Sequence, residues 1–104
     1  MQQPQPSGFF AVIANTDPRL SDWLTEGCEF ILSDGTLPAK VKTLVAMLCD
    51  APLAREDGVK ALSDRARAMG ASEDEISETI RVAFLMGGLP ALSTGANAFM
   101  EDSN

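Results

Sequence analysis

Few residues in this sequence are of the types that carry catalysis or bind metal ions. The chain of 104 residues contains no histidine and no tyrosine. It therefore lacks the side chain best suited to proton transfer near neutral pH, which is also the commonest ligand of transition metals. Two cysteines, Cys28 and Cys49, stand much farther apart than the two positions of a Cys-x-x-Cys motif. We accordingly predict no catalytic residue, no metal site and no cofactor for a single chain.

The two cysteines are interpreted as buried structural thiols. Both fall on the apolar side of a predicted helix, where cysteine behaves as a small hydrophobic residue. Asp50 follows Cys49 directly, and a negative charge beside a thiol disfavours the reactive thiolate. A redox role for Cys49 is the less favoured alternative, and we expect no disulfide between the two cysteines in a reducing compartment.

Charge and hydropathy limit the partners of the chain. It has 15 acidic and 8 basic residues and a formal net charge of −7, whereas nucleic acids and anionic lipids bind cationic surfaces. We expect neither partner. The longest uncharged run, residues 82–100, contains three glycines and Pro90, which interrupt a membrane-spanning helix. No basic flank precedes an apolar stretch at the N-terminus, so we expect a cytoplasmic protein without a signal peptide.

One domain accounts for most of the length. Residues 1–8 are rich in glutamine and proline, and we expect them to form a disordered leader. Residues 9–104 are predicted to form a single domain with one core. Its first segment, Phe9 to Ile13, is too apolar to remain in solvent and forms either a helical turn or an extended clasp on the core.

Caps and apolar spacing predict two helices in the first half of the chain. Asp17 is a capping residue and Pro18 suits the first helical position, so a helix begins here and ends near Asp34. Pro38 opens a second helix, which stops before Pro52. Spacings of three and four residues predict which side chains face a core. They are Leu20, Trp23, Leu24, Gly27, Cys28 and Ile31 in the first helix, and Val41, Leu44, Val45, Leu48 and Cys49 in the second.

Two further helices have clear local signals. The third begins at Leu53 or Arg55 and ends before Gly70, its left-handed cap. The fourth begins at a capping box, in which Ser72 and Glu75 exchange hydrogen bonds between side chain and backbone. The inward residues are Val59, Leu62, Ala66 and Met69 in the third helix, and Ile76, Ile80, Ala83 and Phe84 in the fourth.

The end of the chain predicts a fifth helix. Gly87 and Gly88 break the fourth helix, and Pro90 starts the next one. Residues 82–86, just before the break, are so apolar that we expect them to be enclosed on all sides. The fifth helix turns Leu92, Ala96 and Phe99 inward. No segment alternates with the period of a strand, and the fold class is therefore all-α with about five helices.

Two blocks of the sequence stand out by their glycines, prolines and acids. They are LPAKVKTLVAML, residues 37–48, and ARAMGASEDEISETIRVAFLMGGLPAL, residues 66–92. Their order and spacing, without gaps, resemble those of the carboxymuconolactone decarboxylase/alkylhydroperoxidase D-like family from Leu37 to Phe99. The resemblance implies the helical fold of that family and the location of its pocket.

The resemblance also implies where catalytic residues would stand. In the peroxidase branch a thiolate attacks the peroxide, a second thiol resolves it, and a glutamate and a histidine move the proton. The matching positions are Arg55 and Gly58 for the thiols, Leu62 for the histidine and Ala51 for the glutamate. The decarboxylase branch uses histidines that match Leu62 and approximately Thr94. None of these residues is retained, so neither known reaction is implied.

The candidate pocket implied by the resemblance consists of Arg55, Gly58, Leu62 and Cys49. The favoured function is a catalytically silent subunit with a structural or interaction role. The alternative is a non-redox enzyme or a binder of a small carboxylate, in which Arg55 anchors the anion. A surface arginine paired with the neighbouring acids Glu56 or Asp57 is the more ordinary interpretation of Arg55, and we favour it.

The partner that we expect is a second copy of this chain. Five short helices carry more large apolar side chains than one small core encloses, and an uncovered apolar patch normally marks an interface. Members of the resembled family typically form trimers or hexamers, in keeping with the usual closed symmetry of oligomers. We therefore predict a homo-oligomer, a trimer or a hexamer, rather than a monomer. The side chains concerned are Phe9, Phe10, Trp23, Phe30, Phe84 and Phe99, of which Phe30 gives the first long helix a second apolar edge.

Overall fold

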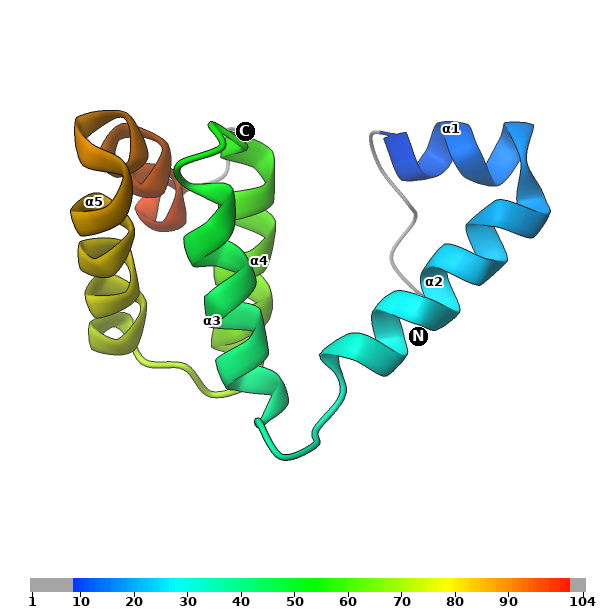
Figure 1. The fold of residues 1–104 in the computed structure, drawn as a ribbon, viewed down its shortest axis with the longest axis horizontal. Helices are drawn as coiled ribbons and strands as arrows, with labels where there is room; N and C mark the ends of the chain where they lie inside the picture. Colours follow the sequence, from blue (N-terminus) through cyan, green and yellow to red (C-terminus); the bar gives the residue numbers. More distant parts are fainter. Residues whose placement is uncertain (1–8, 102–104) are drawn as a thin grey trace. The chain divides into compact units, whose positions relative to one another are not determined.

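The computed structural model describes residues 9–101, and this part of the chain is all-α, which confirms the predicted fold class (Figure 1). The leader predicted for residues 1–8 lies outside the described residues. Contacts divide the chain into two units, one ending at Ser33 and one beginning at Asp34, within the stretch predicted to be one domain. The elements are helices α1 (Phe9–Thr16), α2 (Pro18–Leu32), α3 (Ala39–Asp50), α4 (Glu56–Ala68) and α5 (Glu73–Gly95), and the 3-10 helix η1 (Ala96–Phe99).

The unit that ends at Ser33 consists of α1 and α2. The predicted start of α2 is confirmed, because Oδ1 of Asp17 accepts a 3.1 Å hydrogen bond from the amide of Leu20 and Pro18 is the first helical residue. The short apolar segment at the start of this unit is helical rather than extended. The rings of Phe9 and Phe10 stack there, with their centroids 4.2 Å apart.

Within its own unit the apolar stripe of α2 is not enclosed, and its packing on a core stays a prediction. No residue of α1 or α2 is buried, and Trp23 and Phe30 are 71% and 79% exposed. Two short helices cannot by themselves enclose a large side chain. Both predicted apolar edges of α2 therefore lie at the surface of this unit.

The unit that begins at Asp34 has a core. Helices α3, α4 and α5 contact one another, and η1 contacts α4 and α5 (Figure 1). Most of the buried apolar residues are alanines, so the helices approach one another closely. These residues are Met47, Ala51, Val59, Ala66, Ala71, Ile76, Ile80, Ala83, Ala91 and Ala98, with Leu44, Leu48 and Leu62 packed against them.

Helix α3 turns only part of the predicted side to the core, with Leu44 and Leu48 packed against it as predicted. Thr43 and Met47 are buried, whereas Val41, Val45 and Cys49 are exposed. A threonine can lie in this core because its hydroxyl donates a 2.8 Å hydrogen bond to the carbonyl of Ala39. Apolar spacing alone missed this position, and the interpretation of Cys49 as a buried thiol is wrong. Cys28 is exposed as well.

The predicted end of α4 and the predicted start of α5 are confirmed. Gly70 follows α4 with φ 95°, and α5 begins at the predicted capping box. The amide of Glu75 donates to Oγ of Ser72 at 3.0 Å, and the amide of Ser72 donates to Oε1 of Glu75 at 2.9 Å. Val59 and Ala66 of α4 are buried as predicted.

Helix α5 is interrupted where the glycines predict a break. Gly88 has φ 73° and ψ −161°, which no helix contains, so α5 consists of two helical segments. Gly87 is required for close packing, because a Cβ there would lie 2.8 Å from Ala91 and 3.0 Å from Pro52. In the second segment, a Cβ on Gly95 would lie 2.9 Å from Ile80. Both segments therefore approach their neighbours through glycine.

Two predictions about the later helices are wrong. Residues 82–86 are not enclosed: of their large side chains Leu85 is 79% exposed, and Phe84 is exposed as well. Near the end of the chain, Leu92, Ala96 and Phe99 are exposed. Small residues take the inward positions instead, because the close approach through Gly95 leaves no room for large side chains. They are Ala91, Thr94 and Ala98.

One described stretch, Glu73–Phe99, is long and apolar enough to cross a membrane by length and composition. Its backbone breaks at Gly88, and its first segment buries Ile76, Ile80 and Ala83 in the core. The absence of a membrane partner stays a prediction.

Candidate functional site

The turn between α3 and α4, together with the first half of α4, holds most of the positions at which the resemblance places catalytic groups. It closes with the two hydrogen bonds of a Schellman motif, from the amide of Arg55 to the carbonyl of Asp50 (3.1 Å) and from the amide of Ala54 to the carbonyl of Ala51 (3.2 Å). Ala54 takes the left-handed position with φ 58°, where glycine is usual. The turn is thus well ordered but locally strained.

The side chains of Asp50, the last residue of α3, and Arg55, which precedes α4, meet beside the first turn of α4. A Cβ on Gly58 would collide with the carboxylate of Asp50, so glycine at this position makes room for that carboxylate. Asp50 is mostly buried, with 18% of its side chain exposed, whereas 66% of the Arg55 side chain is exposed. Nη1 of Arg55 lies 3.8 Å from Oδ1 of Asp50, the distance of a loose ion pair. The acid that pairs with Arg55 is therefore Asp50, not Glu56 or Asp57.

The other predicted site residues lie in different surroundings. Leu62 packs against the core, and Ala51 and Thr94 are buried. Cys49 is an exposed, free thiol on α3. Two grooves on this unit are lined by other residues, one of them between α3 and α5 and the other beside α4 and η1. The structure thus brings Arg55 and Gly58 together around Asp50, and a pocket shared by all four candidates stays a prediction.

The groove between α3 and α5 has a volume of about 340 Å³ and is largely apolar. At one end Nζ of Lys40 lies 3.0 Å from Oε2 of Glu75. The backbone hydrogen bond from Ser72, and then Lys40, lower the pKa of Glu75. The hydroxyl of Thr79 donates a 2.8 Å hydrogen bond to the carbonyl of Glu75. The lining consists of Val41, Leu44, Val45, Leu48, Glu75, Glu78, Thr79 and Val82.

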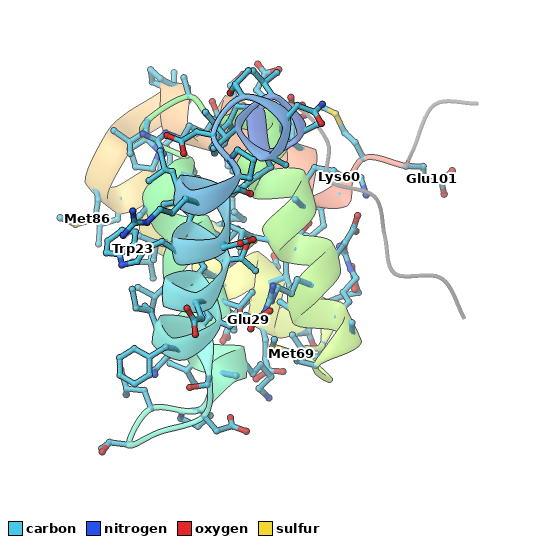
Figure 2. The ribbon with its side chains drawn as sticks, turned by 90° about the vertical axis from the view of Figure 1, so that its right-hand side faces the viewer. Trp23, Glu29, Lys60, Met69, Met86 and Glu101 are labelled. Atoms are coloured by element: carbon cyan, nitrogen blue, oxygen red, sulfur yellow. The ribbon has the colours of Figure 1, made fainter. Side chains whose placement is uncertain are left out.

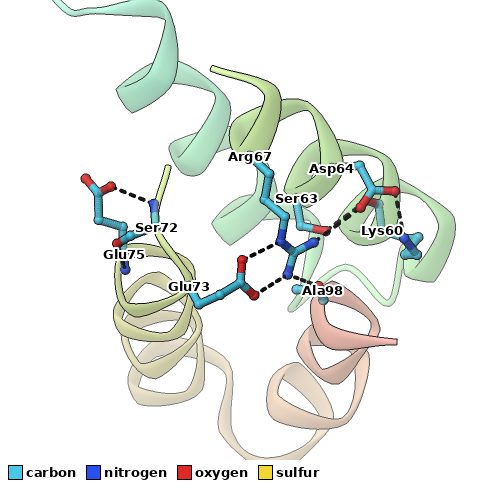
Figure 3. A network of polar contacts seen from close by, with 8 residues as sticks. All are labelled: Lys60, Ser63, Asp64, Arg67, Ser72, Glu73, Glu75 and Ala98. Atoms are coloured by element: carbon cyan, nitrogen blue, oxygen red, sulfur yellow. Dashed lines mark hydrogen bonds and ion pairs between the residues drawn. The ribbon is translucent and has the colours of Figure 1, made fainter. Parts of the chain in front are cut away.

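The second groove borders a polar network centred on Arg67 (Figure 3). Its guanidinium donates two hydrogen bonds to Glu73, of 2.7 and 2.9 Å, and a third of 2.7 Å to the carbonyl of Ala98. A further bond of 3.2 Å reaches Asp64, which also accepts from Lys60 at 2.7 Å. The hydrogen bonds with Arg67 lower the pKa of Glu73, and Glu73 raises that of Arg67. The arginine uses four of its five N–H donors and ties η1 to α4 and α5.

Two of these residues were missed by the sequence analysis. Asp50 entered it only as the neighbour of Cys49, although Gly58 in the first turn of a helix was a signal that something approaches closely. Arg67 was not among the candidate residues, and nothing local to it indicates its bond to Ala98. No group of three or more potential metal-binding side chains occurs among residues 9–101.

Comparison with known proteins now identifies the family. The model of the carboxymuconolactone decarboxylase family matches residues 18–101. A search of curated proteins finds no match. The family match begins at Pro18 rather than at Leu37, where the predicted resemblance begins, so α2 lies within it. Because the match spans most of the chain and the helical fold agrees, this chain belongs to the carboxymuconolactone decarboxylase family.

Proposed function

We propose that this chain is a cytoplasmic member of the family without thiol peroxidase chemistry, acting as a structural or interaction subunit in a homo-oligomer. The observation that carries the proposal is the ion pair at the start of α4. Where the peroxidase branch carries its two thiols, this chain carries Arg55 and Gly58, and the carboxylate of Asp50 fills the space beside Gly58.

Peroxide reduction requires a thiolate and a thiol that resolves the resulting sulfenic acid. Cys49 is a single exposed thiol on α3, and Cys28 belongs to the other unit of the chain. No histidine exists to move the proton. These absences support a protein that has kept the fold of the family and lost its chemistry.

A peroxidase assay tests this proposal. We expect purified protein to consume no peroxide above background in the presence of a dithiol reductant, with Cys49→Ala as the matched control. Turnover in the wild type that disappears in the variant would overturn the proposal, because it would assign the chemistry to the exposed thiol of α3.

The alternative, a binder of small carboxylates, has one observation in its favour. Arg55 is exposed, and its pair with Asp50 is loose at 3.8 Å, so part of the guanidinium can meet an anion from solvent. The same aspartate weighs against it, because its negative charge repels a second carboxylate from the site. We therefore rank this function below the silent subunit.

Thermal-shift screening against carboxylate metabolites distinguishes the two functions. A ligand at 100 times its dissociation constant would add about 2.7 kcal/mol to the free energy of unfolding. We expect no carboxylate to produce such a shift. A shift in the wild type that is lost in Arg55→Gln would establish the alternative.

Self-assembly is tested by light scattering on the full chain at low micromolar concentration. We expect the mass of a trimer or a hexamer, because many large apolar side chains lie at the surface. A mass near 11.0 kDa, together with an intact far-UV helical signal, would overturn this part of the proposal.

A further inference from the structure

One arginine joins the two ends of the last helical stretch. Glu73 is the first residue of α5, and Ala98 lies in η1, which follows α5 directly. Nη2 of Arg67 donates to both of them, at 2.9 Å to Oε1 of Glu73 and at 2.7 Å to the carbonyl of Ala98 (Figure 3). The start of α5 and the end of η1 are thus held together through one side chain of α4.

The break at Gly88 allows the chain to return to this arginine. Gly88 has φ 73° and ψ −161°, a conformation that is open almost only to glycine. The part after the break, drawn in orange to red in Figure 1, lies beside the first segment of α5. A Cβ on Gly95 would lie 2.9 Å from Ile80, so the two segments of α5 pack closely against each other.

Residues 89–99, which follow the break, bury only small side chains. The buried ones are Ala91, Thr94, Gly95 and Ala98. Because small side chains remove little apolar area from water, packing alone stabilises this stretch weakly. The charge-assisted hydrogen bond from Arg67 to Ala98 therefore makes a large relative contribution to holding residues 89–99 in place.

A groove of about 420 Å³ separates this stretch from α4. Figure 2 shows Lys60 on α4 and Glu101 just beyond η1, and both residues line the groove. On the α4 side, Nζ of Lys60 lies 2.7 Å from Oδ2 of Asp64, which in turn accepts from Arg67. The groove thus marks the line along which residues 89–99 could part from α4.

We propose that residues 89–99 form a flap, hinged at Gly88 and latched by Arg67, which opens while α3, α4 and the first segment of α5 stay folded. Opening breaks the hydrogen bond from Arg67 to Ala98 and moves Gly95 away from Ile80. Such a local opening costs less free energy than global unfolding. The inference does not depend on the proposed function, because all the contacts that carry it lie in the unit that begins at Asp34.

The latch is electrostatic, and this property distinguishes it from apolar packing. Arg67 is held in position by two partly exposed carboxylates, those of Asp64 and Glu73. Ion pairs of this kind weaken as the ionic strength rises. We therefore expect sodium chloride to favour the open flap, whereas it would not weaken the packing of the small buried side chains.

Hydrogen–deuterium exchange on the full chain measures the opening. Arg67→Gln should raise the exchange rates of the amides of residues 92–99 roughly tenfold, since the charge-assisted bonds are lost. The amides of α3 should keep their wild-type rates. Arg65→Gln is the matched control, because it removes the same charge from the same last turn of α4, and it should change neither set of amides.

Two further variants keep the test valid if Arg67→Gln does not fold. Gly88→Ala is strained in the closed flap and relaxes when the flap opens, so the same amides should exchange faster. Glu73→Gln should have a smaller effect in the same direction, because the bond from Arg67 to Ala98 remains. Sodium chloride should accelerate the exchange of these amides in the wild type, but not in Arg67→Gln.

Two results would overturn the flap. An equal acceleration of all amides in the variants would show that residues 89–99 open only when the whole unit unfolds. Wild-type rates in every variant would show that neither Arg67 nor Gly88 controls this stretch. Both results would leave the proposed function standing, because that proposal is tested by peroxide consumption and by mass.

Discussion

The turns that end α3 and α4 have the same hydrogen-bond pattern but different residues at the left-handed position. After α4, the amide of Ala71 donates to the carbonyl of Ala66 at 2.9 Å, and Gly70 adopts φ 95°. After α3, the equivalent bond from Arg55 to Asp50 is 3.1 Å, and Ala54 adopts φ 58°. Only the first of these turns uses the residue that avoids strain.

The helices that follow the two turns also differ, because only α5 has a favourable cap at its first turn. Helix α5 begins with a capping box, whereas α4 begins at Arg55 without a side-chain cap. The less favourable turn contains Arg55, which the resemblance matches to a thiol of the peroxidase branch. Packing holds this turn in place, because Ala51 is buried and Pro52 lies against Gly87. Tertiary contacts thus support local strain at this turn.

The largest effect is expected from Gly70→Ala. Alanine at φ 95° should lower the free energy of unfolding by about 1–2 kcal/mol, because its Cβ is strained in the left-handed region. Urea unfolding followed by circular dichroism measures the change. A variant as stable as the wild type would show that this turn relaxes easily, and the contrast with Ala54 would disappear.

Ser72→Ala tests the helix cap that follows the turn after α4. Losing the cap should destabilise the protein by about 1 kcal/mol, since the amide of Glu75 loses its acceptor. The thermal midpoint is a sufficient readout, with Ser77→Ala inside α5 as the control. An unchanged midpoint would mean that the cap contributes nothing to the stability of α5.

Ala54→Gly should change the free energy of unfolding in the opposite direction and by a smaller amount. Glycine removes the strain at φ 58° but gives the unfolded chain more freedom, so we expect a net stabilisation of about 0.5 kcal/mol. The same urea series measures it. Destabilisation by this variant would indicate that the methyl group of Ala54 contributes packing that outweighs the strain.

The smallest effect concerns pH. The pKa of Glu73 and that of Glu75 are lowered in the folded state, by Arg67 and by the Ser72 amide respectively. Their stabilisation is complete above the unfolded pKa of a glutamate, about 4.3, and is lost as the pH falls through the lower folded pKa. The thermal midpoint should therefore fall in this acidic range, and less steeply in Glu73→Gln. Equal slopes would show that the pair with Arg67 has no influence on stability.

Several features of the fold followed from neighbouring residues in the sequence. The start of α2 at Pro18, the cap at Ser72 and the end of α4 before Gly70 were all predicted and confirmed. Each depends on hydrogen bonds and backbone angles within a few residues, so the local sequence is sufficient. The break of α5 at Gly88 was also predicted from local sequence and confirmed.

Burial was predicted less well, because it depends on which helices become neighbours. Spacing indicated Val41 and Val45 as inward residues of α3, yet the contacts of α3 bury Thr43 and Met47. Near the end of the chain, close approach at Gly95 selected small inward residues over Leu92 and its neighbours. In both cases apolar character was a poorer guide than the space available.

The helical class and the family could be predicted from the amino-acid sequence alone, since they rest on composition, caps and motif spacing. The contacts of Asp50 and Arg67 required the three-dimensional structure. Asp50 meets Gly58 across a turn, and Arg67 reaches the carbonyl of Ala98 from 31 residues away. Gly58 indicated only that some group approaches closely, and the bond between Arg67 and Ala98 forms only when packing brings distant segments together.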